Sequence, residues 1–351
     1  MKSLFLSVIG QDDNIGDSAL RRGLISGLRS PDIQLHLYVG GNSSGYVTGL
    51  GVSPADVLYT ERSEWLASMR VNRGRGNSSY SSNAGEVSTM TGPRYLGRDQ
   101  LASLLKVRSN GGALVHTGVG IRSPYTSSRI AKWSALRWFD IVTWRDEVSR
   151  DYAGVGAVAP DWGFNTDAGG TTDDSVGERS TIVVSLRGDR EYPSPEWFTA
   201  VKTIIAHYGV QPVILVQVKR DGERAVEIAS ELGSAARVVP WESDDHHTQE
   251  EVARHVYRDA IAVVSDRLHA LILGATEGAY PLGFPPSDPR KLTRTLAPAR
   301  FEYFEPSVAG LEVEALPTTA QMLDDVIART RQARAELEEL SMRIRRCVET
   351  R

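Results

Sequence analysis

The stretch IAVVSDRLHALILGATEGAYPLGF, residues Ile261 to Phe284, reads as a strand, a helix and a second strand. After the first apolar run, Leu271, Ile272 and Ala275 fall on one helical face, and AYPLGF then begins a new apolar run. Continuous apolar runs separated by a helix predict parallel strands that are buried on both faces. This unit therefore predicts an α/β fold.

The same alternation extends outward from this unit in both directions. In the second half, TIVVSL, PVILVQV and ARVVP are predicted strands, and PEWFTAVKTIIAHYG, GERAVEIASELG and TQEEVARHVYRDA are predicted helices. In the first half, LFLSVIG, IQLHLYVGG, ADVLYT and GALVHTGVGI are predicted strands, and SALRRGLISGLRS is a predicted helix. We predict two doubly wound Rossmann-like domains that face a cleft, with ligands beyond the carboxyl ends of the strands.

Composition shifts along the chain predict the domain boundaries. The polar, acidic stretch NTDAGGTTDDSVGERS has no apolar period, which predicts a linker at 166–180 between domains at 1–165 and 181–316. Residues 317–351 read as one long C-terminal helix with Thr318 or Thr319 as its N-cap. The segment Val71 to Gly97 is rich in Gly, Ser, Asn and Arg, and we interpret it as a long loop, either a lid or a disordered insert.

Length and charge exclude several classes of protein. The chain has 351 residues, which favours two domains, and a formal net charge of −4, which argues against a nucleic-acid-binding protein. Its single cysteine, Cys347, excludes a disulfide framework and a cysteine metal site. No stretch approaches the ~20 apolar residues that cross a bilayer. We therefore expect a cytoplasmic protein, which would reach a membrane-linked substrate from the water side.

Two basic residues lie where a predicted strand ends and a predicted helix begins. Arg267 and His269 follow Asp266 at the predicted end of the strand. A helix N-terminus offers free N–H groups and the positive end of its dipole, so an added arginine predicts an anion site. An anion beside His269 would favour the charged imidazole near neutral pH, as a proton donor requires. The alternative is that Asp266 caps the helix and pairs with Arg267 while His269 is only packed.

Two further cations follow strands of the same half. Arg187 comes just past VVSL, and Lys291 lies after the strand that follows the His269 helix. Because the carboxyl ends of parallel strands meet at one edge, Arg187, Arg267 and Lys291 could converge on one small, highly charged ligand. Taken singly, each of the three is also explained as a solvated surface charge.

The loop after the first strand, GQDDNIGDSALRRGL, is rich in carboxylates. It carries Asp12, Asp13, Asn14, Gly16 and Asp17, which suit sugar hydroxyl groups better than phosphates. It lacks the spacing of a dinucleotide or phosphate-binding loop. The alternative is that Asp17 or Ser18 simply caps the helix. His116, at the end of a first-domain strand, either lines the cleft or is buried in the core.

Other reactive patterns are absent or are explained locally. ESDDHHTQEEVARH places two aspartates beside two histidines, but neighbouring residues do not all aim at one ion, and Thr248 with Glu251 forms a predicted capping box. No Ser-His-Asp set is evident, and Cys347 lies in a largely charged terminal helix. We predict no metal site and no resident cofactor.

The chain resembles the polysaccharide pyruvyl transferase family. The resemblance rests on DNIGDSAL, VVSLR and SDRLHALILGA, with support from FDIVTWRDEVS, VAPDWGF, VQVKRD and the trailing lysine, in the order expected of the family from about residue 8 to 295. The supporting matches contain Arg145, Asp146, Ser149, Asp161, Gln217 and Asp221. The segment SNGGALVHTGVG departs from the glycine-rich strand end usual in the family, and Val71 to Gly97 looks like a private insert.

The resemblance implies a GT-B-like enzyme that uses phosphoenolpyruvate as co-substrate and forms a cyclic pyruvyl ketal on a sugar of a cell-surface or exported glycan. It implies that His269 either protonates the methylene carbon or assists phosphate departure. The residues implied at the donor side are Arg187, Arg267, His269 and Lys291; those implied in catalysis are His269, Asp17 and Asp13; those implied at the acceptor are Asp12, Asn14, Gly16 and His116. The acceptor, whether free or lipid-linked, would lie on the side of domain 1–165, and phosphoenolpyruvate on the side of 181–316.

Two other functions compete with this interpretation. A GT-B glycosyltransferase that uses a nucleotide sugar would need an acidic residue for the ribose, and Glu277 is the obvious candidate. A non-catalytic carbohydrate-binding or assembly protein would use the long C-terminal helix as a partner surface. The presence of both arginines and the histidine argues against the second of these. We expect a peripheral protein at the inner membrane face if the acceptor is lipid-linked, and leave open whether it forms a homo-oligomer.

Overall fold

The computed structural model of the protein describes residues 1–71, 77–88, 98–122, 134–166, 179–282, 286, 290–301 and 316–351. These residues form two parallel β-sheets that follow one another along the chain, as predicted. We call the sheet of residues 2–158 with its helices the first lobe, and the sheet of residues 181–281 with its helices the second lobe. Most of the linker predicted at 166–180 lies outside the described residues, so the domain boundaries stay a prediction.

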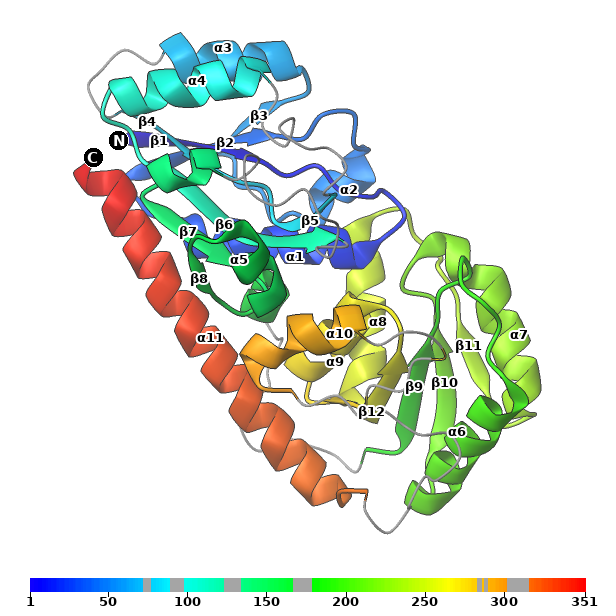
Figure 1. The fold of residues 1–351 in the computed structure, drawn as a ribbon. Coiled ribbons are helices and arrows are strands. Elements are labelled where there is room, and N and C mark those ends of the chain that lie inside the picture. Colours follow the sequence, from blue (N-terminus) through cyan, green and yellow to red (C-terminus); the bar gives the residue numbers. More distant parts are fainter. Residues whose placement is uncertain are drawn as a thin grey trace.

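The first lobe is built on an eight-stranded sheet (Figure 1). Its strands run in the order β3-β2-β1-β4-β6-β7-β8, with β5 paired to β6, and all of these pairs are parallel. The strands are β1 (Lys2–Ser7), β2 (Ile33–Tyr38), β3 (Val57–Tyr59), β4 (Ser78–Ser81), β5 (Gly85–Ser88), β6 (Leu114–Arg122), β7 (Ile141–Trp144) and β8 (Ala157–Val158). Because the order reverses beside β1, the carboxyl ends of the strands open a crevice there.

Strands β4 and β5 correct the interpretation of Val71 to Gly97 as one long loop. Strand β4 is serine-rich, yet it lies between β1 and β6 in the middle of the sheet. One of its hydroxyl groups bonds to the neighbouring backbone: Ser79 Oγ accepts from Ala113 N at 3.0 Å. Just beyond β4, Ser82 Oγ donates to Thr117 O at 3.1 Å and accepts from Thr117 N at 2.9 Å. The parts of this segment at 72–76 and 89–97 lie outside the described residues, so the lid stays a prediction for them.

The second lobe is built on a five-stranded parallel sheet in the order β11-β10-β9-β12-β13. The strands are β9 (Thr181–Ser185), β10 (Gln211–Leu215), β11 (Arg237–Val239), β12 (Ala260–Ser265) and β13 (Tyr280–Pro281). The central strands β9 and β12 are almost fully buried, which explains their unbroken apolar sequences. The crevice of this lobe lies beyond the ends of β9 and β12.

Helices cover both sheets. They are α1 (Ile15–Leu28), α2 (Ser44–Thr48), α3 (Arg62–Val71), α4 (Arg98–Ser109), α5 (Glu147–Ala153), α6 (Pro195–Tyr208), α7 (Gly222–Leu232), α8 (His246–Arg258), α9 (Leu268–Thr276), α10 (Arg290–Leu296) and α11 (Thr319–Thr350). Short 3-10 turns are η2 (Ser134–Trp138), η3 (Trp162–Asn165), η4 (Lys219–Asp221) and η5 (Ala297–Ala299). None of the helices among the described residues has both the length and the apolar character that a bilayer span requires.

The helix caps confirm one prediction and correct two. Thr318 caps α11 in a capping box with Gln321, as expected of that position. Helix α1 is capped by Asn14, rather than by Asp17 or Ser18. Helix α8 begins at His246 with Asp245 as its cap, so the capping box predicted further along the segment is wrong.

The long helix α11 joins the two lobes. In Figure 1 it runs along one side of the molecule past both sheets, with the C-terminus near the N-terminus. It packs on α9, β12 and β13 of the second lobe and on α1, β1 and β2 of the first. Arg345 Nη1 donates to Gly27 O at 3.1 Å, and Ser30 Oγ donates to Glu349 at 2.7 Å. This helix holds the two strand-end crevices against each other.

The loop after β1 is attached directly to the second lobe. Lys219 N donates to Asp13 O at 2.8 Å, and Asn14 forms an isolated antiparallel bridge with Val218. These bonds place the first loop of one lobe against the end of β10 in the other. The carboxyl ends of both sheets therefore line one shared space.

Candidate functional site

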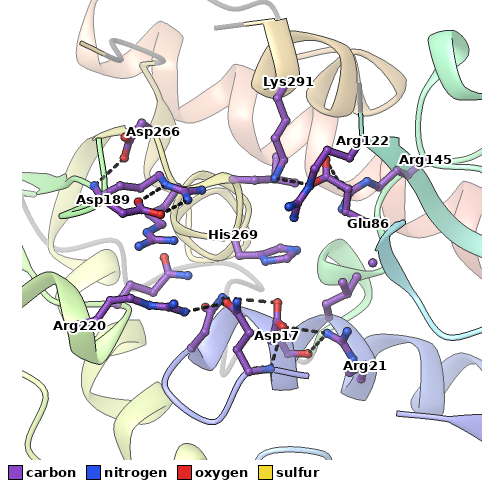
Figure 2. Close-up of a pocket in the computed structure, with 18 residues that line it drawn as sticks. Asp17, Arg21, Glu86, Arg122, Arg145, Asp189, Arg220, Asp266, His269 and Lys291 are labelled. Carbon is purple, nitrogen blue, oxygen red and sulfur yellow. Dashed lines mark hydrogen bonds and ion pairs between the residues drawn. The ribbon is translucent and has the colours of Figure 1, made fainter. Parts of the chain in front are cut away.

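A cavity of about 440 Å³ lies between the strand ends of the two lobes, and it is strongly charged. Seven arginine or lysine side chains line it against four carboxylates, an excess of three positive charges. The cations are Arg21, Arg122, Arg145, Arg187, Arg220, Arg267 and Lys291, and the carboxylates are Asp17, Glu86, Asp189 and Asp266. Figure 2 shows His269 near the centre, between Lys291 and Asp17. This charge balance favours a small polyanion.

The turn from β12 to α9 places Arg267 and His269 in the cavity wall. Ser265 Oγ accepts from Arg267 N at 2.8 Å and so closes the turn, and α9 begins at Leu268 without a side-chain cap. Asp266 accepts from Arg187 N at 2.9 Å. Asp266 therefore does not cap the helix, and its hydrogen bond goes to Arg187 N and not to Arg267. This corrects the alternative in which Asp266 caps the helix and pairs with Arg267. The open helix N-terminus remains available to an anion.

Arg267 and Arg187 are each held by a carboxylate. Arg267 donates from Nε and Nη2 to Asp221 at 2.8 and 2.7 Å, and it is 8% exposed. Arg187 donates from Nε and Nη2 to Asp189 at 2.8 and 2.7 Å. A guanidinium has five N–H donors, so each arginine keeps further donors after this pairing. The pairs fix the orientation of both groups in the cavity wall.

His269 is mostly buried, with a side chain that is 12% exposed. Its Nε2 atom makes no hydrogen bond to any described residue and lies 3.8 Å from Asp161 Oδ1. Burial lowers the pKa of His269, against the opposing effect of Asp161 and Asp17. Within the protein alone this shift favours the neutral imidazole. The expectation of a charged histidine concerns the ring with an anion beside it, and it stays a prediction. An anion beside the ring would raise that pKa.

Lys291 projects from α10 and pairs with Glu86 of β5 across the cavity, at 3.2 Å. Burial lowers the pKa of Lys291 to about 8, against the opposing effect of Glu86. Glu86 also pairs with Arg122 at 3.0 Å and Arg145 at 3.5 Å. Although burial opposes it, Lys291 and the arginines hold the pKa of Glu86 at about 2. This pair of charges connects the two lobes at the cavity.

The loop after β1 contributes Asn14, Gly16 and Asp17 to this region. Asn14 Oδ1 accepts from Gly16 N at 3.0 Å, and Asp17 Oδ2 accepts from Gln11 N at 3.0 Å. A Cβ on Gly16 would lie 2.5 Å from the Cβ of His269, so this position requires glycine. Burial opposes the ionisation of Asp17, but Arg21 and His269 outweigh it and lower its pKa.

Asp12 and Asp13 lie outside the cavity lining. Asp12 accepts from Ser43 N and Ser43 Oγ at 2.8 Å, which ties the loop to α2. Asp13 pairs with Arg220 at 2.8 Å, beside the contact between the lobes. Of Asp12, Asp13 and Asp17, the structure brings only Asp17 into the lining.

His116 is placed in the core of the first lobe and not at the cleft. It is 0% exposed on β6, and its ring centroid lies 4.5 Å from that of Trp144. Burial lowers its pKa to about 3. The structure therefore separates His116 from the other residues considered for the acceptor.

Several lining residues had no role assigned from sequence, above all Glu86, Arg21, Arg122 and Arg220. Arg122 ends β6, so the rule that ligands bind beyond strand ends could have found it. Glu86 belongs to a strand that the pattern did not reveal. Among the described residues no group of three His, Cys, Asp or Glu could hold a metal ion. His246, from the predicted aspartate–histidine cluster, instead contacts Ser18 Oγ at 2.8 Å.

The chain is similar to several solved structures. The UDP-GlcNAc 2-epimerase of Neisseria meningitidis, solved with UDP-GlcNAc bound, is 9% identical over 100% of both chains, with a TM-score of 0.53. A Listeria monocytogenes protein assigned as a UDP-N-acetylglucosamine 2-epimerase is 11% identical over 96% of this chain and 91% of that chain, with a TM-score of 0.50. The E. coli ADP-heptose LPS heptosyltransferase II is 14% identical over 95% and 99%, with a TM-score of 0.44.

The first two likenesses show a GT-B-like fold, as predicted, and nothing further. No curated protein sequence matches the chain. The model of the polysaccharide pyruvyl transferase family matches residues 14–288, a range that contains Asn14, Asp17, Arg187, Arg267 and His269. Since this match covers most of the chain, the protein belongs to the polysaccharide pyruvyl transferase family.

Proposed function

We propose that the protein transfers pyruvate from phosphoenolpyruvate to a sugar of a cell-surface or exported glycan, which forms a cyclic ketal and releases phosphate. The observation that carries this proposal is the cavity around His269, whose lining includes seven cations and four carboxylates. Phosphoenolpyruvate is a compact trianion with a carboxylate and a phosphate, and guanidinium groups match the geometry of both. Family membership supports the transfer of pyruvyl groups to a polysaccharide.

The donor binds to the second lobe in this proposal. Arg187 and Arg267 receive the carboxylate and the phosphate through the N–H groups that Asp189 and Asp221 leave free. The N-terminus of α9 and the ammonium group of Lys291 complete the anion site. The trianion raises the pKa of His269, so that the imidazole takes up a proton as the donor binds.

His269 then delivers this proton to the methylene carbon, and C2 becomes oxocarbenium-like. The oxygen of one sugar hydroxyl bonds to C2 and loses its proton to Asp17, which lines the cavity on the first lobe. The bond from C2 to the phosphate oxygen breaks, and the oxygen of a second hydroxyl closes the ring. The second hydroxyl proton leaves with the phosphate, so that atoms and charges balance. The fixed cations stabilise the charge that develops on the phosphate.

Thermal unfolding with added ligands tests the donor. Phosphoenolpyruvate at a hundredfold excess over its dissociation constant is expected to add about 2.7 kcal/mol of stability. Arg187→Gln removes a cavity cation without leaving a buried charge, since Asp189 is 52% exposed, and should abolish this effect. Arg237→Gln is the control, because Arg237 is exposed at the start of β11. Stabilisation by a nucleotide sugar and not by phosphoenolpyruvate would contradict the proposal.

The nucleotide-sugar alternative loses its ribose candidate. Glu277 is 0% exposed and pairs with Arg254 and Arg258, so it faces the protein interior. Product mass analysis on the native glycan separates the two functions, because a ketal adds one pyruvyl group to the acceptor and phosphate appears in equal amount. A saccharide acceptor and a cytoplasmic location stay predictions, and self-association stays open.

Donor affinity is expected to depend on the charge of Lys291. Since burial lowers its pKa to about 8, the ammonium group is present below this value and lost above it. The dissociation constant of phosphoenolpyruvate should therefore rise between pH 7 and pH 9, by about tenfold for the loss of one favourable contact worth 1.4 kcal/mol. Lys291→Arg, which stays charged, should flatten this rise. Calorimetric titrations across the pH range measure it; an equally steep rise in the variant would exclude Lys291 as its source.

A further inference from the structure

Asp161 is a buried carboxylate that faces His269 without bonding to it. It is 0% exposed, and its Oδ1 atom lies 3.8 Å from His269 Nε2. The same oxygen caps η3 by accepting from Gly163 N at 2.9 Å, and Oδ2 lies 3.5 Å from Arg145 Nη1. The cap holds the carboxylate in a fixed orientation. A buried acceptor thus stands beside a buried ring nitrogen that lacks a hydrogen-bond partner among the described residues.

We propose that Asp161 is the positioning residue of His269: it accepts a hydrogen bond from Nε2–H, fixes that tautomer and stabilises the imidazolium, so that Nδ1 is the nitrogen that serves the substrate. A shift of roughly 1 Å closes the present gap to a hydrogen bond, and such contacts tighten when a catalytic complex forms. A carboxylate that orients a histidine in this way is a recurring arrangement in acid–base catalysis. This inference rests on the proposed function only for the proton's destination.

The charges around the ring come from four elements. Asp161 at the start of η3 and Asp17 of α1 favour the charged imidazole, whereas Arg145 after β7 and Lys291 of α10 disfavour it. Of the two carboxylates, Asp161 is the one at 3.8 Å from a ring nitrogen. Asp17 is committed to Gln11 N at 3.0 Å and to Arg21 at 3.6 Å. Asp161 is therefore the carboxylate placed to hold the ring proton.

Nitrogen-15 NMR of the histidines tests the pairing without any substrate. Neutral His269 in the wild-type protein is expected to carry its proton on Nε2. In Asp161→Asn, which keeps an oxygen to cap η3, the pKa of His269 is expected to fall by about one unit, because the charge that favours the imidazolium is lost. A wild-type proton on Nδ1, or an unchanged pKa in the variant, overturns the inference even if the proposed reaction proves wrong.

Kinetics then separate positioning from structural support. At saturating phosphoenolpyruvate, Asp161→Asn is expected to lower kcat on the order of a hundredfold, with donor affinity changed less than about threefold. His269 must be protonated to act as an acid, so activity is lost as pH rises through its pKa, and the alkaline limb of the kcat profile should move to lower pH in the variant.

The matched control is Asp56→Asn. Asp56 has a side chain that is 3% exposed, pairs with Arg29 at 2.8 Å and accepts from Ser53 N at 2.7 Å, far from the cavity. It should leave kcat and its pH profile unchanged. A loss of kcat in Asp161→Asn with an unmoved pH profile would assign Asp161 a structural role and overturn the inference. A wild-type protein inactive on phosphoenolpyruvate would instead refute the proposed function and leave the NMR result standing.

Discussion

Replacing His269 with glutamine is expected to lower kcat by roughly a thousandfold, within the range that a positioned general acid contributes. Glutamine has a similar length and is polar, but it has no titratable proton to give to the methylene carbon. Burial lowers the pKa of His269, which favours the uncharged imidazole before the donor binds. Donor affinity should therefore change by less than about tenfold, the equivalent of one pKa unit of coupling.

Two measurements made on one preparation distinguish these effects. Single-turnover phosphate release reports the chemical step, and calorimetric titration with phosphoenolpyruvate reports donor binding. His207→Gln is the control, because His207 is exposed on α6 and lies outside the cavity lining. If the glutamine variant keeps more than a tenth of the wild-type kcat, His269 does not transfer the proton and only lines the cavity.

The second lobe could be predicted from sequence because its strands are buried on both faces. Unbroken apolar runs at β9, β10 and β12 alternate with helices of regular period, and the structure has parallel strands at each of them. The same logic predicted that the third of these strands ends at Asp266; in the structure β12 ends at Ser265 and α9 begins three residues later. Local apolar patterning was sufficient there, because a strand that is buried on both faces appears in the sequence as an unbroken apolar run.

Strands β4 and β5 could not be predicted by the same means. Ser79 of β4 and Ser82 just after it bond to backbone groups of β6 and of the residue before β6. These partners lie more than thirty residues away in the chain, so no local pattern records them. Glu86 lies on β5. Because this strand was not predicted, Glu86 was not predicted as one of the cavity carboxylates.

The cations of the site were predictable, whereas their partners were not. Arg187 and Arg267 follow strand ends, which fixes the edge of the sheet at which they lie, and the structure brings both into one cavity. Their carboxylate partners, Asp189 and Asp221, could not be predicted, because these pairs depend on how the side chains are oriented in the folded protein. His116 could not be resolved either way, because β6 is buried on both faces and alternation says nothing about which side chain reaches the cleft.

Replacing Glu250 with glutamine is expected to destabilise the protein by about 3 kcal/mol, as when one partner of a buried ion pair is removed. Glu250 of α8 is 2% exposed. It bonds Arg254 Nε at 2.6 Å within the second lobe and Arg22 Nη1 at 2.7 Å on α1 of the first. Loss of its charge removes the carboxylate partner that Arg22 and Arg254 share, although Arg254 still pairs with Glu277. Urea unfolding at neutral pH measures the change.

The pH dependence of this difference identifies its electrostatic origin. Burial raises the pKa of Glu250, but Arg22 and Arg254 outweigh it, so the folded-state pKa lies below the ordinary 4.5. A depressed pKa stabilises the fold in full above the unfolded-state value and loses that contribution as pH falls through the folded-state value. The difference in unfolding free energy between wild type and Glu250→Gln should therefore be largest above pH 4.5 and decrease below it.

Glu336→Gln is the control. It breaks an exposed pair with Arg300 and should cost less than about 1 kcal/mol at any pH. A Glu250→Gln variant as stable as wild type at neutral pH would show that desolvation of the three charges cancels their attraction, so that this network adds nothing to the stability of the contact between the lobes.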